Sequence, residues 1–257
     1  MDFGLSGKVG IVTGASRGIG RAIAETLAAE GMKLALVARS SDQLRALADS
    51  LPAQTLIRAV DLAEPAAPAA VVAATTETFG RLDLLVNNAG ATKRGDFLAL
   101  GDDDWRDGFE LKFFGAMRGS RAAWPHLQAS HGAIVNIAGI GGRTGTAEFT
   151  IGGSVNAALM NLTKALADRG VKDGVRVNAI NPGSIATERL QARLASFAIE
   201  RGIDVASAGQ EMARAFNIAR FGEPVEIGRV VAFLASPMAA YCQGAILDVD
   251  GGATRTL

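Results

Sequence analysis

Short apolar runs alternate with longer amphipathic stretches along most of the chain. The short runs are mostly rich in Val, Ile and Leu, which is typical of parallel strands covered on both faces. In the longer stretches apolar positions recur at helical spacing, as Leu159, Leu162 and Leu166 do. Strands are therefore predicted at 9–13, 33–38, 55–60, 82–87, 133–137, 176–180 and 245–249, and helices at 19–30, 42–50, 65–79, 103–128, 154–169 and 225–234.

This alternation predicts an α/β fold: one Rossmann-like, doubly wound domain over residues 1–257, with a parallel sheet and right-handed crossovers. No linker, repeat or low-complexity tract divides it. Residues 188–220 are a long polar and helical insertion without a strand pattern. Because α/β ligands bind beyond the carboxyl ends of the strands, we favour a substrate lid here over a passive pair of surface helices.

Composition narrows the class of protein. Hydrophobic residues make up 49% of the 257, and Lys+Arg and Asp+Glu both number 26, so the formal net charge is zero. Disorder is excluded, and no global electrostatic attraction to nucleic acid or an anionic membrane exists. Cys242 is the single cysteine, so no intramolecular disulfide forms. No signal peptide and no apolar run of about 18 residues is present, and a cytoplasmic location is expected.

A glycine-rich loop joins the first predicted strand to the first helix. Glycines at such a turn let backbone N–H groups approach a pyrophosphate, which then sits at the positive end of the helix. The strand–turn–helix context that this motif requires is met, although a turn without a ligand is the alternative. The candidate cofactor-binding residues of the loop are Gly14, Ser16, Arg17, Gly18, Ile19 and Gly20.

The end of the second strand indicates which dinucleotide binds. An acid at this point binds the ribose 2′-hydroxyl of NAD, whereas an arginine accommodates the 2′-phosphate of NADP. Arg39 lies 19 residues after Gly20, and no acid occupies Val37 or Ala38. With Arg17 as a second guanidinium, we predict NADP(H) over NAD(H). The alternative is that both arginines are solvated surface charges.

Together with further motifs, the chain resembles the short-chain dehydrogenase/reductase family nearly end to end. The resemblance implies a seven-stranded Rossmann-like sheet, a small-molecule substrate, and usually a homotetramer or homodimer. It also implies cofactor contacts at Asp61 and Leu62 after the third strand, at Asn88, Ala89 and Gly90 after the fourth, and at Pro182, Gly183, Ile185 and Thr187 near the nicotinamide.

The active site departs from the family pattern. Members carry a helix Asn, a Ser after the fifth strand, and a Tyr-x-x-x-Lys in which the Tyr is the general acid or base. The matching positions here hold Lys112, Gly139, Gly152 and Asn156 respectively. Glycines offer no side-chain proton donor, and the single tyrosine, Tyr241, lies far along the chain. The cofactor site can therefore be carried over from the family, but the mechanism cannot.

Two of the departures are reciprocal. The family's Asn position holds Lys112 and its Lys position holds Asn156, so an ammonium and an amide have exchanged places. Lys112 shares a predicted helix face with Trp105, Phe109 and Ala116. A lysine there must either snorkel to the surface or find a partner, and burial would lower its pKa. We take Lys112 and Asn156 as the candidate catalytic residues.

Three functions remain open on this evidence. The protein is an NADP(H)-dependent oxidoreductase with an unusual proton donor, Lys112 or a water; or it binds NADP(H) without turnover, as a sensor or structural subunit; or the fold serves non-redox chemistry. The cofactor motifs argue against the third, and we favour the first. Arg143 and Glu148 border the expected pocket and are possible substrate contacts. The substrate itself is not encoded in any motif.

Overall fold

The computed structural model describes residues 2–255. Seven parallel strands form one sheet in the order β3-β2-β1-β4-β5-β6-β7. The prediction of a single Rossmann-like domain with a seven-stranded parallel sheet is confirmed. The strands are β1 (Val9–Thr13), β2 (Lys33–Ala38), β3 (Thr55–Ala59), β4 (Leu84–Asn87), β5 (Ala133–Ile137), β6 (Arg176–Pro182) and β7 (Ile246–Val249).

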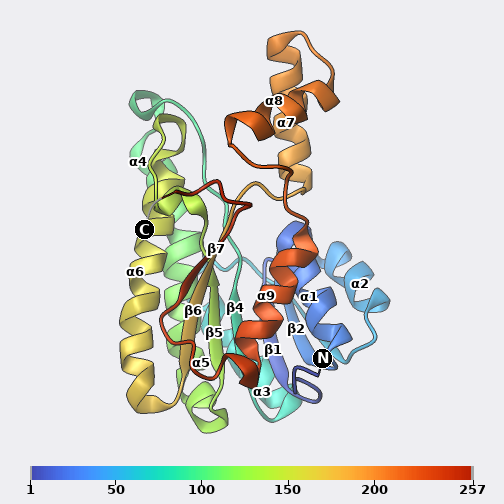
Figure 1. Ribbon diagram of the computed structural model, residues 1–257. Helices are drawn as coiled ribbons and strands as arrows, with labels where there is room; N and C mark the ends of the chain where they lie inside the picture. Colours follow the sequence, from blue (N-terminus) through green and yellow to red (C-terminus); the bar gives the residue numbers. More distant parts are fainter. Residues whose placement is uncertain (1, 256–257) are drawn as a thin grey trace.

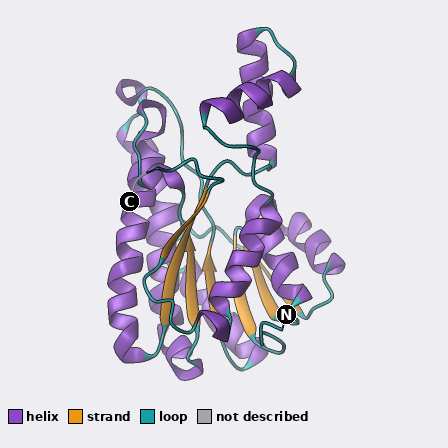
Figure 2. Ribbon diagram, viewed as in Figure 1, coloured by secondary structure: helices purple, strands orange, loops and turns teal. Residues whose placement is uncertain are grey.

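Helices cover both faces of the sheet (Figure 2). On one face lie α1 (Gly18–Ala29), α2 (Ser41–Ser50) and α9 (Pro224–Ala235), whose apolar side chains share a core with β1 and β2. On the other lie α3 (Ala67–Phe79), α5 (Gly115–Ser130) and α6 (Thr150–Asp173), which pack in a second core. This two-sided burial explains why the strands read as short apolar runs rather than as alternating patterns.

The topology places the candidate site. The strand order reverses between β1 and β4, which pair directly through Gly10–Leu84 to Val12–Val86. Ligands of doubly wound folds bind outside the carboxyl ends of the strands at such a switch point. The glycine-rich loop after β1 and the Asn88–Gly90 segment after β4 both begin there.

One predicted helix has an internal irregularity. The stretch 103–128 is continuous but divides into α4 (Asp102–Phe109), a π-helical turn (Glu110–Phe114) and α5. A π turn inserts one residue into the helical repeat, which a 3.6-residue periodicity does not reveal, and such turns are frequent at functional sites. Lys112 lies at its centre. Short 3₁₀ turns occur at Phe97–Ala99, Ile140–Gly142, Ala147–Phe149 and Pro237–Ala239.

The fifth predicted helix is longer than its pattern indicated. It spans Thr150–Asp173 instead of 154–169, so that Gly152 and Gly153 lie inside its first turn. Glycine is a poor helix former, and these two glycines made the predicted helix begin later, at residue 154. Packing overrides that preference, because a Cβ on Gly153 would lie 2.9 Å from the Gly141 carbonyl oxygen.

The insertion at 188–220 forms α7 (Glu188–Arg201) and α8 (Val205–Ala215). Figure 1 shows both helices (orange) standing beyond the carboxyl ends of the strands, away from the sheet. They are held together by a small apolar core of their own, built on Leu190, Leu194 and Met212. Among the described residues, no helix combines the length and the hydropathy needed to cross a bilayer.

Candidate active site

The glycine-rich loop is tied to the end of β4 by a compact set of hydrogen bonds. The Thr13 hydroxyl donates to the Val86 carbonyl (3.0 Å) and accepts from the backbone N–H groups of Asn88 (2.9 Å) and Ala89 (3.0 Å). The Asn88 amide donates to the Thr13 carbonyl oxygen at 2.9 Å. These bonds fix the loop and the Asn88–Gly90 segment relative to each other across the topological switch point.

The loop geometry fits a bound pyrophosphate. Gly14 has φ +66° and Gly18 has φ +55°, a region that favours glycine. A Cβ on Gly20 would collide with the Gly14 carbonyl oxygen. Arg17, the residue just before α1, makes no side-chain capping bond, so the first N–H groups of the helix have no side-chain cap and can serve an anion. On these observations the residues present fit the phosphates of a dinucleotide.

Two exposed arginines stand where the sequence predicted a 2′-phosphate site. Arg39 follows β2, and its Nη1 lies 3.8 Å from the Asp61 carboxylate after β3. Arg17 lies 3.8 Å from Glu188 at the start of α7. Both guanidinium groups are about 70% exposed, at 73% and 67% of side-chain surface. Long, exposed ion pairs hold a side chain weakly, so each guanidinium can reorient onto a phosphate.

The predicted nicotinamide segment runs from β6 towards α7. Gly183 lies so close to Asp250 that a Cβ would sit 2.7 Å from its Cα. Ile185 pairs with Gly222 in a parallel bridge, and Ala186 N–H donates to the Gly222 carbonyl at 2.7 Å. Thr187 in turn lies against Gly18, with its Cγ2 3.3 Å from a Cβ built there. The segment thus connects the phosphate loop to the base of α7.

Lys112 points into the site rather than to the surface. Its Nζ donates a 2.7 Å hydrogen bond to the Ala138 carbonyl oxygen at the end of β5. Its aliphatic stem packs on Gly90, where a Cβ would lie 2.8 Å from Lys112 Cδ. Burial, with added repulsion from Arg189, lowers the pKa of Lys112 to about 8. The snorkelling alternative is therefore wrong for this side chain.

Asn156 approaches the same point from α6. It is 3% exposed, and its Nδ2 lies 2.9 Å from the position of a Cβ on Gly139. Lys112 and Asn156 therefore meet the adjacent residues Ala138 and Gly139 from two different helices. Within the described residues, the Asn156 Oδ1 is buried without a hydrogen-bond partner. A buried acceptor left free is costly and marks a place where a donor is missing.

Phe149 fills the space beside Gly152, a feature that the sequence did not indicate. A Cβ on Gly152 would overlap the Phe149 ring, and one on Gly141 would lie 2.9 Å from it. The Arg94 guanidinium carbon stacks 4.0 Å from the ring centroid. The glycine at the tyrosine position is thus not an empty space, because an aromatic ring from the preceding 3₁₀ turn packs directly against it.

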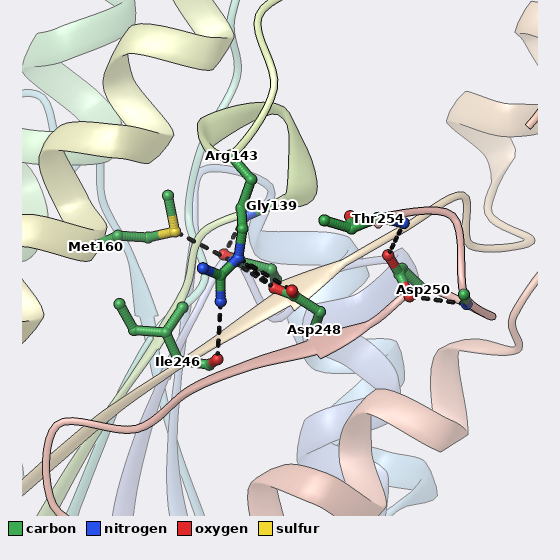
Figure 3. Close-up of polar contacts among 9 residues, drawn as sticks. Gly139, Arg143, Met160, Ile246, Asp248, Asp250 and Thr254 are labelled. Carbon is green, nitrogen blue, oxygen red and sulfur yellow. Dashed lines mark hydrogen bonds and ion pairs between the residues drawn. The ribbon is translucent and has the colours of Figure 1, made fainter. Parts of the chain in front are cut away.

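Arg143 has a structural role in place of the possible substrate contact. Figure 3 shows its guanidinium turned onto Asp248 and the Ile246 carbonyl, with Nε–Oδ1 3.0 Å and Nη2–O 3.2 Å. The Asn181 amide also donates to Asp248 (2.8 Å), and its carbonyl oxygen accepts from the Gly139 N–H (3.2 Å). This network anchors the loop after β5 to β6 and β7, and so fixes Gly139.

Comparison with known proteins identifies the family. The family model described as enoyl-(acyl carrier protein) reductase matches residues 14–254. The short-chain reductase protein NovJ of Streptomyces niveus is 38% identical over 95% of this chain and 93% of its own length. The crystal structure of L-sorbose reductase from Gluconobacter frateurii, complexed with NADPH and L-sorbose, is 38% identical with a TM-score of 0.95 over 100% of both chains. The chain belongs to the short-chain dehydrogenase/reductase family.

A further solved structure bears on the departures from the family pattern. A short-chain oxidoreductase from Pseudomonas aeruginosa PAO1, described as containing an atypical catalytic center, is 32% identical with a TM-score of 0.89 over 98% of this chain and 99% of its own. The predicted family is confirmed, and the predicted oxidoreductase class and NADP(H) cofactor agree with these relatives. The roles of individual site residues stay predictions.

Proposed function

We propose that this protein is an NADP(H)-dependent reductase of a small carbonyl or enone compound, in which Lys112 takes the place of the family's tyrosine as proton donor. The observation that carries the proposal is the Lys112 ammonium, bound to the Ala138 carbonyl at 2.7 Å with its pKa lowered to about 8. A general acid works best when its pKa lies near the operating pH. Gly139 and Gly152 offer no competing side-chain donor.

In the proposed reaction NADPH supplies the hydride to the substrate carbon. Lys112 holds a proton at Nζ and delivers it to the substrate oxygen, which gains negative charge as the hydride arrives; a proton from water then restores the ammonium. The Ala138 carbonyl orients Nζ by accepting a hydrogen bond from it. With the cofactor bound, the free Oδ1 of Asn156 would be available to accept a hydrogen bond from a ribose hydroxyl or a water.

Cofactor binding without turnover is the second candidate function. Phe149 favours binding without turnover, because its ring fills the space beside Gly152, the position from which family members supply the proton. The experiment is NADPH oxidation over a panel of carbonyl and enone substrates, paired with NADPH titration. Steady oxidation supports the reductase. Tight NADPH binding with no turnover over the whole panel supports the sensor or structural subunit.

The role of α7 and α8, the oligomeric state and the cellular location are proposals as well. We infer that α7 and α8 act as a substrate lid, which their position beyond the strand ends supports (Figure 1). Assembly as a homotetramer or homodimer is tested by light scattering of the purified protein. A cytoplasmic location, suggested by the single cysteine, is tested by cell fractionation.

Arg39→Ala should weaken NADPH binding by about tenfold or more and leave NADH binding nearly unchanged. A guanidinium–phosphate pair contributes roughly 1.5–3 kcal/mol, and only NADPH carries the 2′-phosphate. Titration of both cofactors measures the effect. Arg45→Ala is the matched control, since Arg45 is similarly exposed (66%) and pairs only with its helix neighbour Asp42. Unchanged NADPH affinity in Arg39→Ala would refute the 2′-phosphate assignment.

The exchanged pair should show energetic coupling. Lys112→Asn and Asn156→Lys each disturb the charge at Ala138–Gly139, while the double variant restores one ammonium and one amide there. Neighbouring residues couple by roughly 0.5–3 kcal/mol, whereas distant ones add. A double-mutant cycle on NADPH affinity measures this term, and we expect the double variant to bind better than either single variant. Strict additivity would show that the two positions do not form one site.

A further inference from the structure

Three arginines surround the mouth of the proposed active site from two sides. Arg94 comes from the loop after β4 and stacks on Phe149, 4.0 Å from the ring centroid. Arg189 begins the lid helix α7, and its Nη2 lies 3.4 Å from the Gly90 carbonyl oxygen, on the residue that packs against Lys112. Arg193 follows one turn later on the same helix face. We call Arg94, Arg189 and Arg193 the arginine cluster.

The contacts of these residues tie the cluster to the reacting end of the pocket. Phe149, which carries Arg94, lies against Gly152 and Gly141. Gly90, which Arg189 reaches, contacts the stem of Lys112. The arginines therefore lie around the part of the site that holds Lys112, since Arg189 acts on the Lys112 ammonium and both lid arginines act on Arg94. A substrate whose carbonyl meets Lys112 has its other end among them.

The positive charge of the cluster is balanced only in part by the protein, because Glu148 is the acidic group that acts on Arg94. Among residues 2–255, neither Lys112 nor any arginine of the cluster forms an ion pair, whereas the adjacent Lys93 binds Asp104 at 2.9 Å. Burial, then repulsion from Arg193, lowers the pKa of Arg94; Glu148 opposes these effects and Arg189 adds to them. Three arginines held together with one acidic group acting on them leave an excess of positive charge, which an incoming anion relieves.

Aromatic rings lie beside two of these three exposed arginines. The Arg94 guanidinium is stacked on Phe149, and that of Arg193 lies 5.2 Å from the centroid of the Phe216 ring on the neighbouring lid segment. Stacked guanidinium groups keep their hydrogen-bonding edges free and present paired donors to planar or tetrahedral oxoanions. The arrangement thus suits a carboxylate or a phosphate better than a neutral hydroxyl compound.

We propose that the arginine cluster binds an anionic group, a carboxylate or a phosphate ester, on the carbonyl substrate. This inference rests on the proposed reductase function and adds the substrate class to it.

The test uses two pairs of probes that differ in charge: 4-oxopentanoate with its methyl ester, and dihydroxyacetone phosphate with dihydroxyacetone. Each is titrated into the full-length protein saturated with NADP⁺, so that binding is read without turnover. We expect the charged member of at least one pair to bind about tenfold or more tightly. The pair with the larger ratio distinguishes a carboxylate from a phosphate.

Substitutions of single arginines then show which residues produce the preference for the charged probe. Arg94→Gln and Arg193→Gln should each reduce the charged-to-neutral ratio several-fold while leaving NADPH affinity within about twofold. Arg201→Gln is the matched control, because Arg201 also stacks on an aromatic ring of α7, Phe197 at 5.3 Å, but at the far end of the helix. It should leave the ratio unchanged.

The possible failures are distinguishable. Failure of the wild-type protein to bind NADPH refutes the proposed function itself. Normal NADPH binding with equal affinities for charged and neutral probes in both pairs refutes the anionic substrate alone. If Arg201→Gln reduces the charged-to-neutral affinity ratio as much as Arg94→Gln and Arg193→Gln do, the preference comes from the overall charge of the lid. That result would refute the arginine cluster as the binding site. Loss of NADPH affinity in Arg94→Gln or Arg193→Gln, with the ratio kept, would assign those arginines to the cofactor phosphates instead.

Discussion

Lys112→Met should lower turnover by a factor on the order of 10²–10⁴ while the protein stays folded and still binds NADPH. That factor is what loss of a positioned general acid costs. Met is close to the Lys stem in length, so the packing of the stem on Gly90 is kept and the ammonium is lost. Single-turnover NADPH oxidation measures the chemical step, and a thermal melt checks the fold. Lys172→Met, on an exposed site near the end of α6, is the control.

The pH profile separates a proton donor from a mere positive charge. The pKa of Lys112 is lowered to about 8, so the ammonium is protonated below pH 8 and loses its proton above it. Reduction needs the protonated form, and its rate should therefore fall as the pH rises through about 8. Lys112→Arg keeps the charge but cannot give up a proton in this range. It should bind NADPH normally and turn over as poorly as Lys112→Met. Full activity in Lys112→Arg would contradict the donor role.

The parts of the site that follow directly from local sequence were predictable. The glycine-rich loop, the end of β2 at Arg39 and the segment after β4 each lie within a few residues of a strand whose apolar run is unmistakable. The parallel sheet then brings the carboxyl ends of these strands together at the switch point, and this does not depend on the conformation of the connecting loops. That Lys112 and Asn156 approach the adjacent residues Ala138 and Gly139 could also be predicted, because the family resemblance fixes the register of both helices.

The remaining features of the site depend on the orientation and packing of individual side chains. Phe149 belongs to a 3₁₀ turn with no periodicity of its own, and nothing in its sequence neighbourhood indicates that its ring packs beside Gly152. The π-helical turn at Lys112 is likewise a property of tertiary packing rather than of pattern. The arginine cluster joins residues about 100 positions apart, Arg94 and Arg193, and only the fold shows that they share one space.

The ring of Phe149 also explains why the tyrosine cannot simply be put back. Gly152→Tyr should destabilise the protein and bring no gain in turnover. The new Cβ would overlap the Phe149 ring, which is itself fixed between Gly141 and the Arg94 guanidinium. Overpacking of this kind costs typically about 1–3 kcal/mol and sometimes more. In a domain of this size it should lower the melting temperature by roughly 2–12 °C.

A second substitution should relieve the clash. Phe149→Gly creates the space that the tyrosine ring needs, so the double variant Gly152→Tyr with Phe149→Gly should melt higher than the sum of the two single effects allows. Gly152→Ala is the minimal probe: it adds the Cβ alone, and it should also destabilise, although alanine favours a helix by about 1 kcal/mol over glycine. Thermal melts of the four proteins of the cycle give the coupling. Two results would contradict this explanation: a Gly152→Ala variant as stable as the wild type, or additive effects in the cycle. Either would show that the Phe149 ring moves aside at little cost and that its packing does not require a glycine at position 152.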